Sequence, residues 1–72
     1  MKISYYPETD SLYIDLCSRV SADSREISPG IVLDYDAEGN LVGIDIDEAS
    51  AKLELQELTL TKLPIELAKL AT

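Results

Sequence analysis

The sequence predicts a small α+β domain, an antiparallel β-meander of about four strands whose one apolar face is covered by a C-terminal helical, leucine-rich tail. Two observations predict it. Apolar and polar residues alternate with period two through several short segments, as in strands with one buried face. Leucines then gather beyond residue 52. We divide the chain into a sheet core with the start of a helix, residues 1–52, and a tail, residues 53–72, that belongs to the same domain or serves as a dimerisation element.

The N-terminal part predicts a first hairpin from two strands, residues 1–6 and 12–17, joined by a turn rich in Pro, Asp and Ser. These residue types favour turns because Pro fixes φ and the short polar side chains bond the local backbone. Residues 24–28 are expected to form an early half of the third strand, broken at Pro29, which cannot donate to a ladder. The expected pairs of the first hairpin are Tyr5 with Leu12 and Ile3 with Ile14.

The segment from Pro29 to Asp47 predicts a second hairpin, because its two arms alternate in phase. We expect Tyr35 to lie opposite Asn40, since this register keeps the aliphatic side chains of both arms on one face. A register with Tyr35 opposite Leu41 would carry Asp45 into the core, where an unpaired carboxylate costs several kcal/mol.

The remaining chain must supply the cover for the sheet. Asp47 is expected to be the N-cap of a short helix. Residues 58–61 alternate like a strand, and Pro64 suits the first position of a second helix. Periodicity does not decide between helix and strand in segments this short, so both interpretations stay open for the tail.

Composition bounds the function. The chain has 14 acidic and 6 basic residues and a net charge of −8, which disfavours direct binding to nucleic acid or to anionic lipid. No apolar run is long enough for a membrane span and no signal-like start is present, so we expect a cytoplasmic protein. A chain of 72 residues buries only about 60% of its unfolded surface, which self-association would improve, so we expect a homo-oligomer.

No residue set predicts a reaction. The chain has no His, so the single cysteine, Cys17, has no base to activate it and no partner for an internal disulfide. No catalytic, metal or cofactor-binding residue is therefore assigned. Three carboxylates, Asp15, Asp34 and Asp45, are expected to line up on the exposed face of the sheet as a candidate surface for a basic partner.

The carboxylates allow two other interpretations. The spacing of Asp34, Asp36, Glu38, Gly39 and Asp45 is near that of a calcium loop. The flanks alternate with period two, however, whereas that loop needs a helix on each side, so an acidic hairpin turn is preferred. The alternative function is an enzyme of unknown type, whose carboxylate site forms at an oligomer interface.

Two stretches resemble a family of short bacterial proteins catalogued as domain of unknown function 2283. The first is the opening, residues 1–14, with its Tyr-x-Pro, Asp and apolar-Tyr-Ile pattern; the second runs from Gly30 to Ile46 and continues to Ala49 and Ser50. The resemblance covers roughly residues 1–52. It implies the small sheet but no activity. Similarity of members to proteins encoded beside toxin-like partners implies an antitoxin-like role, and we expect a non-enzymatic protein-interaction module.

Overall fold

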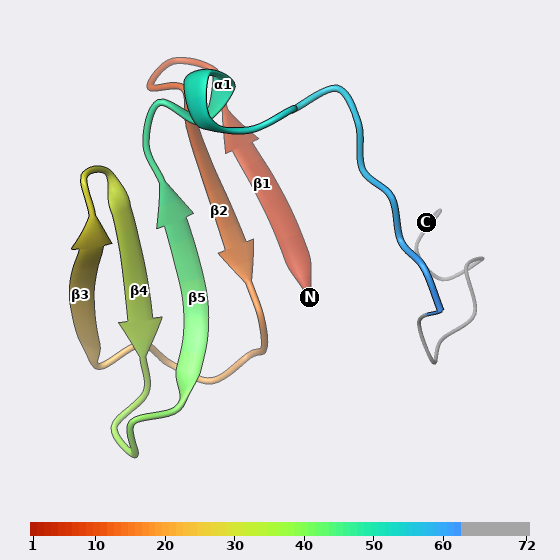
Figure 1. Cartoon of the computed structure of the whole chain (residues 1–72). Coiled ribbons are helices and arrows are strands. Elements are labelled where there is room, and N and C mark those ends of the chain that lie inside the picture. The colour runs from red at the N-terminus through yellow and green to blue at the C-terminus, as the bar shows by residue number, and fades with distance from the viewer. Residues whose placement is uncertain (63–72) are drawn as a thin grey trace.

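The computed structural model describes residues 1–62. They form five strands in a single antiparallel sheet, followed by one short helix at one end of it (Figure 1). The helix in this part of the chain is not long and apolar enough to cross a bilayer. The elements are β1 (Lys2–Tyr6), β2 (Ser11–Asp15), β3 (Asp23–Ser28), β4 (Ile31–Tyr35), β5 (Leu41–Ile46) and α1 (Ala49–Lys52).

The antiparallel sheet and the first hairpin confirm the sequence prediction, with Tyr5 opposite Leu12 and Ile3 opposite Ile14. The predicted meander of about four strands differs from the structure in the number of strands and in their order. Residues 23–28 are a strand of their own, paired with β4, because the chain reverses at Pro29 and Gly30, where Gly30 takes a φ of 76°. The strand order is β1-β2-β5-β4-β3, so β5 joins the two hairpins by pairing with β2.

The register of the second hairpin also differs from the prediction. Tyr35 lies opposite Leu41, and Leu33 lies opposite Ile44. Asp45 nevertheless stays out of the apolar side, opposite Val32, because the ladder shifts by one residue between Asp34 and Tyr35. A β-bulge of this kind changes the phase of a strand without burying a charge.

The register sorts the side chains into two faces, since directly opposed residues share a side of the sheet. The apolar face consists of two rows that cross four strands. The rows are Tyr5, Leu12, Ile46 and Ile31, and Ile3, Ile14, Ile44 and Leu33. The polar face carries Lys2, Ser4, Tyr6, Ser11, Tyr13, Asp15, Ser24, Glu26, Val32, Asp34 and Asp45, with Lys2 directly opposite Asp15.

The helix differs from the prediction as well. It begins after Glu48, which takes the N-cap position in a left-handed conformation (φ 51°) and makes no side-chain cap. Asp47 is therefore not the N-cap. Lys52 donates instead to the backbone carbonyl of Asp47. Residues 58–61 are not in a strand, and the helix expected from Pro64 lies outside the described residues.

The chain beyond α1 passes beside the sheet without forming regular structure. We call residues 53–60 the strap (blue in Figure 1). Its leucines remain at least partly in solvent, with Leu58 69% exposed. Among the described residues, the buried hydrophobic side chains are only Val42, Ile46 and Ala49, so residues 1–62 form one layer with a very small core.

Candidate functional site

The polar face contains a hydrogen-bonded cluster centred on Asp34. The Tyr13 hydroxyl donates to one carboxylate oxygen of Asp34 at 2.6 Å, and the Ser24 hydroxyl donates to the other at 2.6 Å. The residues come from β2, β4 and β3, so the Tyr13 ring must cross β5 to reach Asp34. It crosses over Gly43, where a Cβ atom would lie 2.1 Å from the Tyr13 hydroxyl. Gly43 is thus required for the cluster.

The three predicted carboxylates do lie on this one face. Asp15 and Asp34 flank Gly43 in one row, and Asp45 lies in the next row between Tyr13 and Val32. All three are half-buried. Asp34 is occupied by the two hydroxyls, whereas within residues 1–62 the carboxylates of Asp15 and Asp45 make no hydrogen bond or ion pair. The structure therefore separates one internally bonded carboxylate from two that face solvent.

The electrostatics of the face follow from this crowding of negative charge. The hydrogen bond to Asp34, reinforced by partial burial and by the charges of Asp34, Asp15 and Asp45, raises the pKa of Tyr13 to about 12. Desolvation, with the nearby charges of Asp47 and Asp34, raises the pKa of Asp45. A phenol that holds its proton this strongly is a poor general acid or base near neutral pH. The hydrogen bonds of the cluster hold β2, β3 and β4 together across the polar face.

Sequence reasoning missed Tyr13 and Ser24 as partners of Asp34. A signal for Tyr13 was available in Gly43, because a glycine inside a strand often marks the close approach of another group. No comparable signal identifies Ser24, since its strand was not recognised as separate from β4. Cys17, the single cysteine of the chain, is half-buried and has a free thiol.

The acidic hairpin loop is held by its own hydrogen bonds. The Asp36 carboxylate accepts from the backbone amides of Glu38 (3.0 Å) and Asn40 (2.8 Å) and from the Asn40 side chain (3.2 Å). It also pairs with Arg19 at 3.0 Å. The bonds from Asn40 are the main cause of the lowered pKa of Asp36. The calcium-loop spacing thus matches an Asx-type turn, and residues 1–62 contain no group of three metal-binding side chains.

A second carboxylate, Asp10, ties the first turn to α1. Its backbone carbonyl accepts from the Ala49 amide at 2.8 Å, and its carboxylate accepts from the Ser50 hydroxyl at 2.6 Å and the Ser50 amide at 3.1 Å. The Tyr5 hydroxyl donates to the same carboxylate at 2.8 Å. These bonds, chiefly that from the Ser50 hydroxyl, lower the pKa of Asp10. We call this contact the Asp10 latch; it caps the helix from a distant part of the chain.

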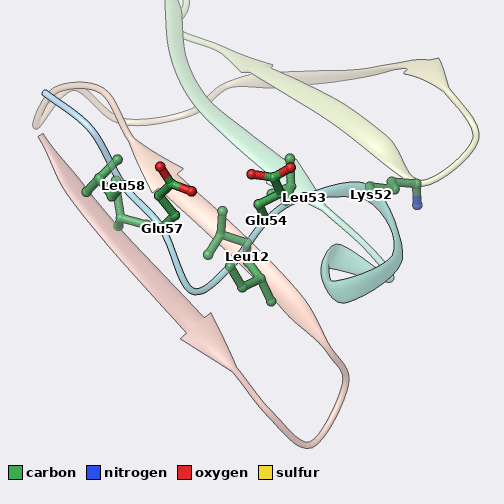
Figure 2. Close-up of a pocket in the computed structure, with 8 residues that line it drawn as sticks. Leu12, Lys52, Leu53, Glu54, Glu57 and Leu58 are labelled. Atoms are coloured by element: carbon green, nitrogen blue, oxygen red, sulfur yellow. The ribbon is translucent and has the colours of Figure 1, made fainter. Parts of the chain in front are cut away.

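The other side of the sheet carries an apolar groove beneath the strap. It has a volume of about 460 Å³ and is lined by Ile3 and Leu12 of the sheet and by residues 52–55, 57 and 58. Figure 2 shows Leu12 lying between the strap and β2, with Leu53 and Leu58 on the strap and the carboxylates of Glu54 and Glu57 beside them. The groove is a gap between the strap and the sheet, which do not pack tightly together.

The sequence profile of the family described as protein of unknown function (DUF2283) matches residues 2–50. The chain belongs to this family. The match to DUF2283 spans all five strands and ends at Ser50, the residue held by the Asp10 latch. The strap lies beyond it. No curated protein and no solved structure is significantly similar to the chain.

Proposed function

We propose that the protein is a non-enzymatic protein-interaction module and that its polar face binds a basic partner protein. The observation that supports this most is the position of Asp15 and Asp45, two half-buried carboxylates on adjacent strands of one face, neither of them bonded within residues 1–62. Opposite charge across an interface gives specificity and speeds association. The net charge of −8 acts in the same direction at longer range.

The chemistry of the face supports binding over catalysis. The hydroxyls of Tyr13 and Ser24 both donate to Asp34, and the raised pKa of Tyr13 makes proton transfer by it unfavourable near neutral pH. A small basic toxin-like protein is the form of partner that the family resemblance suggests. The segment 53–72 enters the proposal as a cover or assembly element for the apolar face.

The test is an affinity measurement with charge-matched variants. A basic protein retained by the immobilised chain from a lysate of its own cells is identified, purified and titrated at two salt concentrations. The double variant Asp15→Asn, Asp45→Asn should bind it about tenfold more weakly and with a smaller salt dependence. Asp34 is left unchanged, because its substitution would also break the bonds from Tyr13 and Ser24.

The control is Glu8→Gln, Glu38→Gln, which removes the same charge from two exposed turns away from the polar face. It should bind like the wild type. Equal affinities for the two double variants would show that overall charge, and not this face, is responsible. Absence of a retained basic protein that binds the purified chain would refute the partner class.

A further inference from the structure

The apolar face is largely uncovered in residues 1–62. Of its eight side chains, only Ile46 is buried, and Ile3 and Tyr5 on the edge strand are 45% and 44% exposed. A stable domain normally buries such a face against a second layer. The helix α1 has only four residues and lies at one end of the sheet (Figure 1), so it does not provide that layer.

The strap does not provide it either. A groove of about 460 Å³ separates it from the apolar face, where Ile3 and Leu12 line the groove. Three of its own leucines line this groove and still remain partly exposed. The leucines with large exposed fractions are Leu53, Leu55, Leu58 and Leu60. The strap therefore extends the apolar surface beyond the rows and leaves it open.

Charge indicates what could cover this surface. The two apolar rows contain no ionisable carboxylate or amine, whereas Asp15, Asp34 and Asp45 all lie on the opposite face. On the apolar side, β3 adds Asp23 and Arg25, which pair with each other at 3.6 Å at the margin, and the strap adds Glu54 and Glu57 beside the groove. Two copies that each carry −8 repel through most of their surface. Contact through the apolar rows keeps the carboxylate-rich faces outermost, separated by both sheets, and so minimises that repulsion.

We propose that the apolar face binds a second copy of this chain, face to face, as a two-fold symmetric β-sandwich. Both copies use the same surface, as a two-fold interface requires, and aligned sheets pack in this way in sandwich folds. The acidic faces then point outward on both sides of the dimer. Such a dimer leaves the polar face free for another partner and does not bring the three carboxylates together into a site at the interface.

The size of the face sets the expected affinity. A five-stranded sheet with strands of about five residues has a projected area of roughly 400 Å² per copy, at about 4.8 Å between strands and about 3.3 Å per residue. Two copies bury roughly twice that before pleating and the strap leucines are counted, which is below the roughly 1,200 Å² of a specific stable interface and fits a weak or transient one. We therefore expect a dimer that dissociates on dilution through the micromolar range, not a permanent one.

The experiment uses the full chain and measures its mass by light scattering across a dilution series. The wild type should show twice the monomer mass of 7.9 kDa at high concentration. The variant Ile3→Asp should raise the dissociation constant at least about a hundredfold, because it buries a carboxylate in the interface. Because Ile3 is 45% exposed in the single chain, the change should cost the monomer little stability. Val20→Asp adds the same charge at an 83% exposed site outside the strands and should leave the dimer intact.

A second measurement needs no variant and distinguishes the alternatives. In a mixture of differently labelled chains, intermolecular methyl NOEs among Ile14, Ile44 and Leu33 should appear, and the outward amides of β1 should exchange as fast as in the monomer. A dimer with protected β1 amides and no such NOEs would be an edge-to-edge pair and would overturn the proposal. A chain that stays monomeric at high concentration would also overturn it and assign the cover to the chain's own remaining residues.

The two proposals fail separately. Loss of the dimer in Ile3→Asp with retained binding of the basic partner would support both and place them on different faces. A wild-type dimer whose mass is unchanged by Ile3→Asp would refute the sandwich and leave the partner-binding proposal standing.

Discussion

The two faces of the sheet satisfy their chemical needs in opposite ways. On the polar face, Asp34 is bonded to the hydroxyls of Tyr13 and Ser24, and these bonds are made inside one chain. On the apolar face, two complete rows of aliphatic and aromatic side chains lie in register, and most of them remain partly exposed. A single layer can complete a hydrogen-bond cluster on its own, but it cannot bury a face, because burial needs a second layer.

The largest expected effect is on the polar face, at Gly43. A Cβ atom there would lie 2.1 Å from the Tyr13 hydroxyl and 2.7 Å from the ring. Gly43→Ala must therefore displace the ring and break its bond to Asp34, and we expect a loss of about 2–3 kcal/mol in the free energy of unfolding. Urea denaturation measures it. In a Tyr13→Ser background the same substitution should cost much less; an equal cost would show that the ring is not the cause.

A smaller effect is expected from Tyr13→Phe, which removes the hydroxyl and keeps the ring. We expect a loss of about 1 kcal/mol in unfolding free energy, since one hydrogen bond to a charged group is lost while Ser24 still donates to Asp34. Tyr6→Phe, at an exposed position without a side-chain hydrogen bond in the described chain, is the control and should be neutral.

The hydrogen bond of the Tyr13 hydroxyl predicts a loss of stability at alkaline pH. The folded pKa of this hydroxyl, about 12, lies above the ordinary value of 10.0. The Tyr13 bond therefore stabilises the fold fully below pH 10 and is lost as the pH rises through about 12. Ultraviolet titration of wild type against Tyr13→Phe should show one late-ionising tyrosine; its absence from the difference would contradict the bond.

A matched methyl deletion sharpens the contrast within the apolar face. Ile46 is 8% exposed and Ile3 is 45% exposed in the same sheet. At concentrations where the chain is monomeric, Ile46→Val should cost about 1 kcal/mol in unfolding free energy and Ile3→Val about 0.3 kcal/mol, because less surface is buried around Ile3. Equal costs in the monomer would mean that Ile3 is covered within one chain.

The smallest effect concerns pH. Because the pKa of Asp45 is raised, its charged form opposes folding, and this penalty is present at neutral pH and disappears as the carboxyl is protonated. Asp45→Asn should stabilise the protein by a few tenths of a kcal/mol at pH 7, with the difference vanishing in acid. Asp10 and Asp36 have lowered pKa values, so their charged forms stabilise the folded protein. This stabilisation is present at neutral pH and is lost as the pH falls through the lowered pKa values of the folded state. Paired denaturation curves at several pH values check both signs.

Much of the sheet could be predicted from period-two alternation, because that pattern records which side of a strand is buried. It identified the first hairpin with its register and placed three carboxylates on one face. It did not identify the pairing of β2 with β5, since alternation says nothing about which strands are neighbours. The wrong register at Tyr35 came from assuming an uninterrupted ladder. The premise that Asp45 avoids the apolar side was correct, but the ladder shift achieves this without the predicted pairing.

The candidate site was predicted only in outline. Charge patterning placed Asp15, Asp34 and Asp45 together, but it could not show that Asp34 is already bonded, because Tyr13 reaches it diagonally across a third strand. The helix cap was missed for a similar reason. Local rules favoured Asp47, whereas the group that caps Ser50 is Asp10, forty positions earlier in the chain. Contacts between segments far apart in sequence leave no local pattern.

The strand order also determines how the chain can fold. The pairs β1–β2, β3–β4 and β4–β5 are each joined by a short turn, so they form with little loss of chain entropy. The pairing of β2 with β5, for example of Leu12 with Ile46, is different, because it closes a long loop that contains β3 and β4. We expect this closure to limit the folding rate. The Asp10 latch, which needs the same two segments, then forms late and should slow unfolding while leaving the rate of folding almost unchanged.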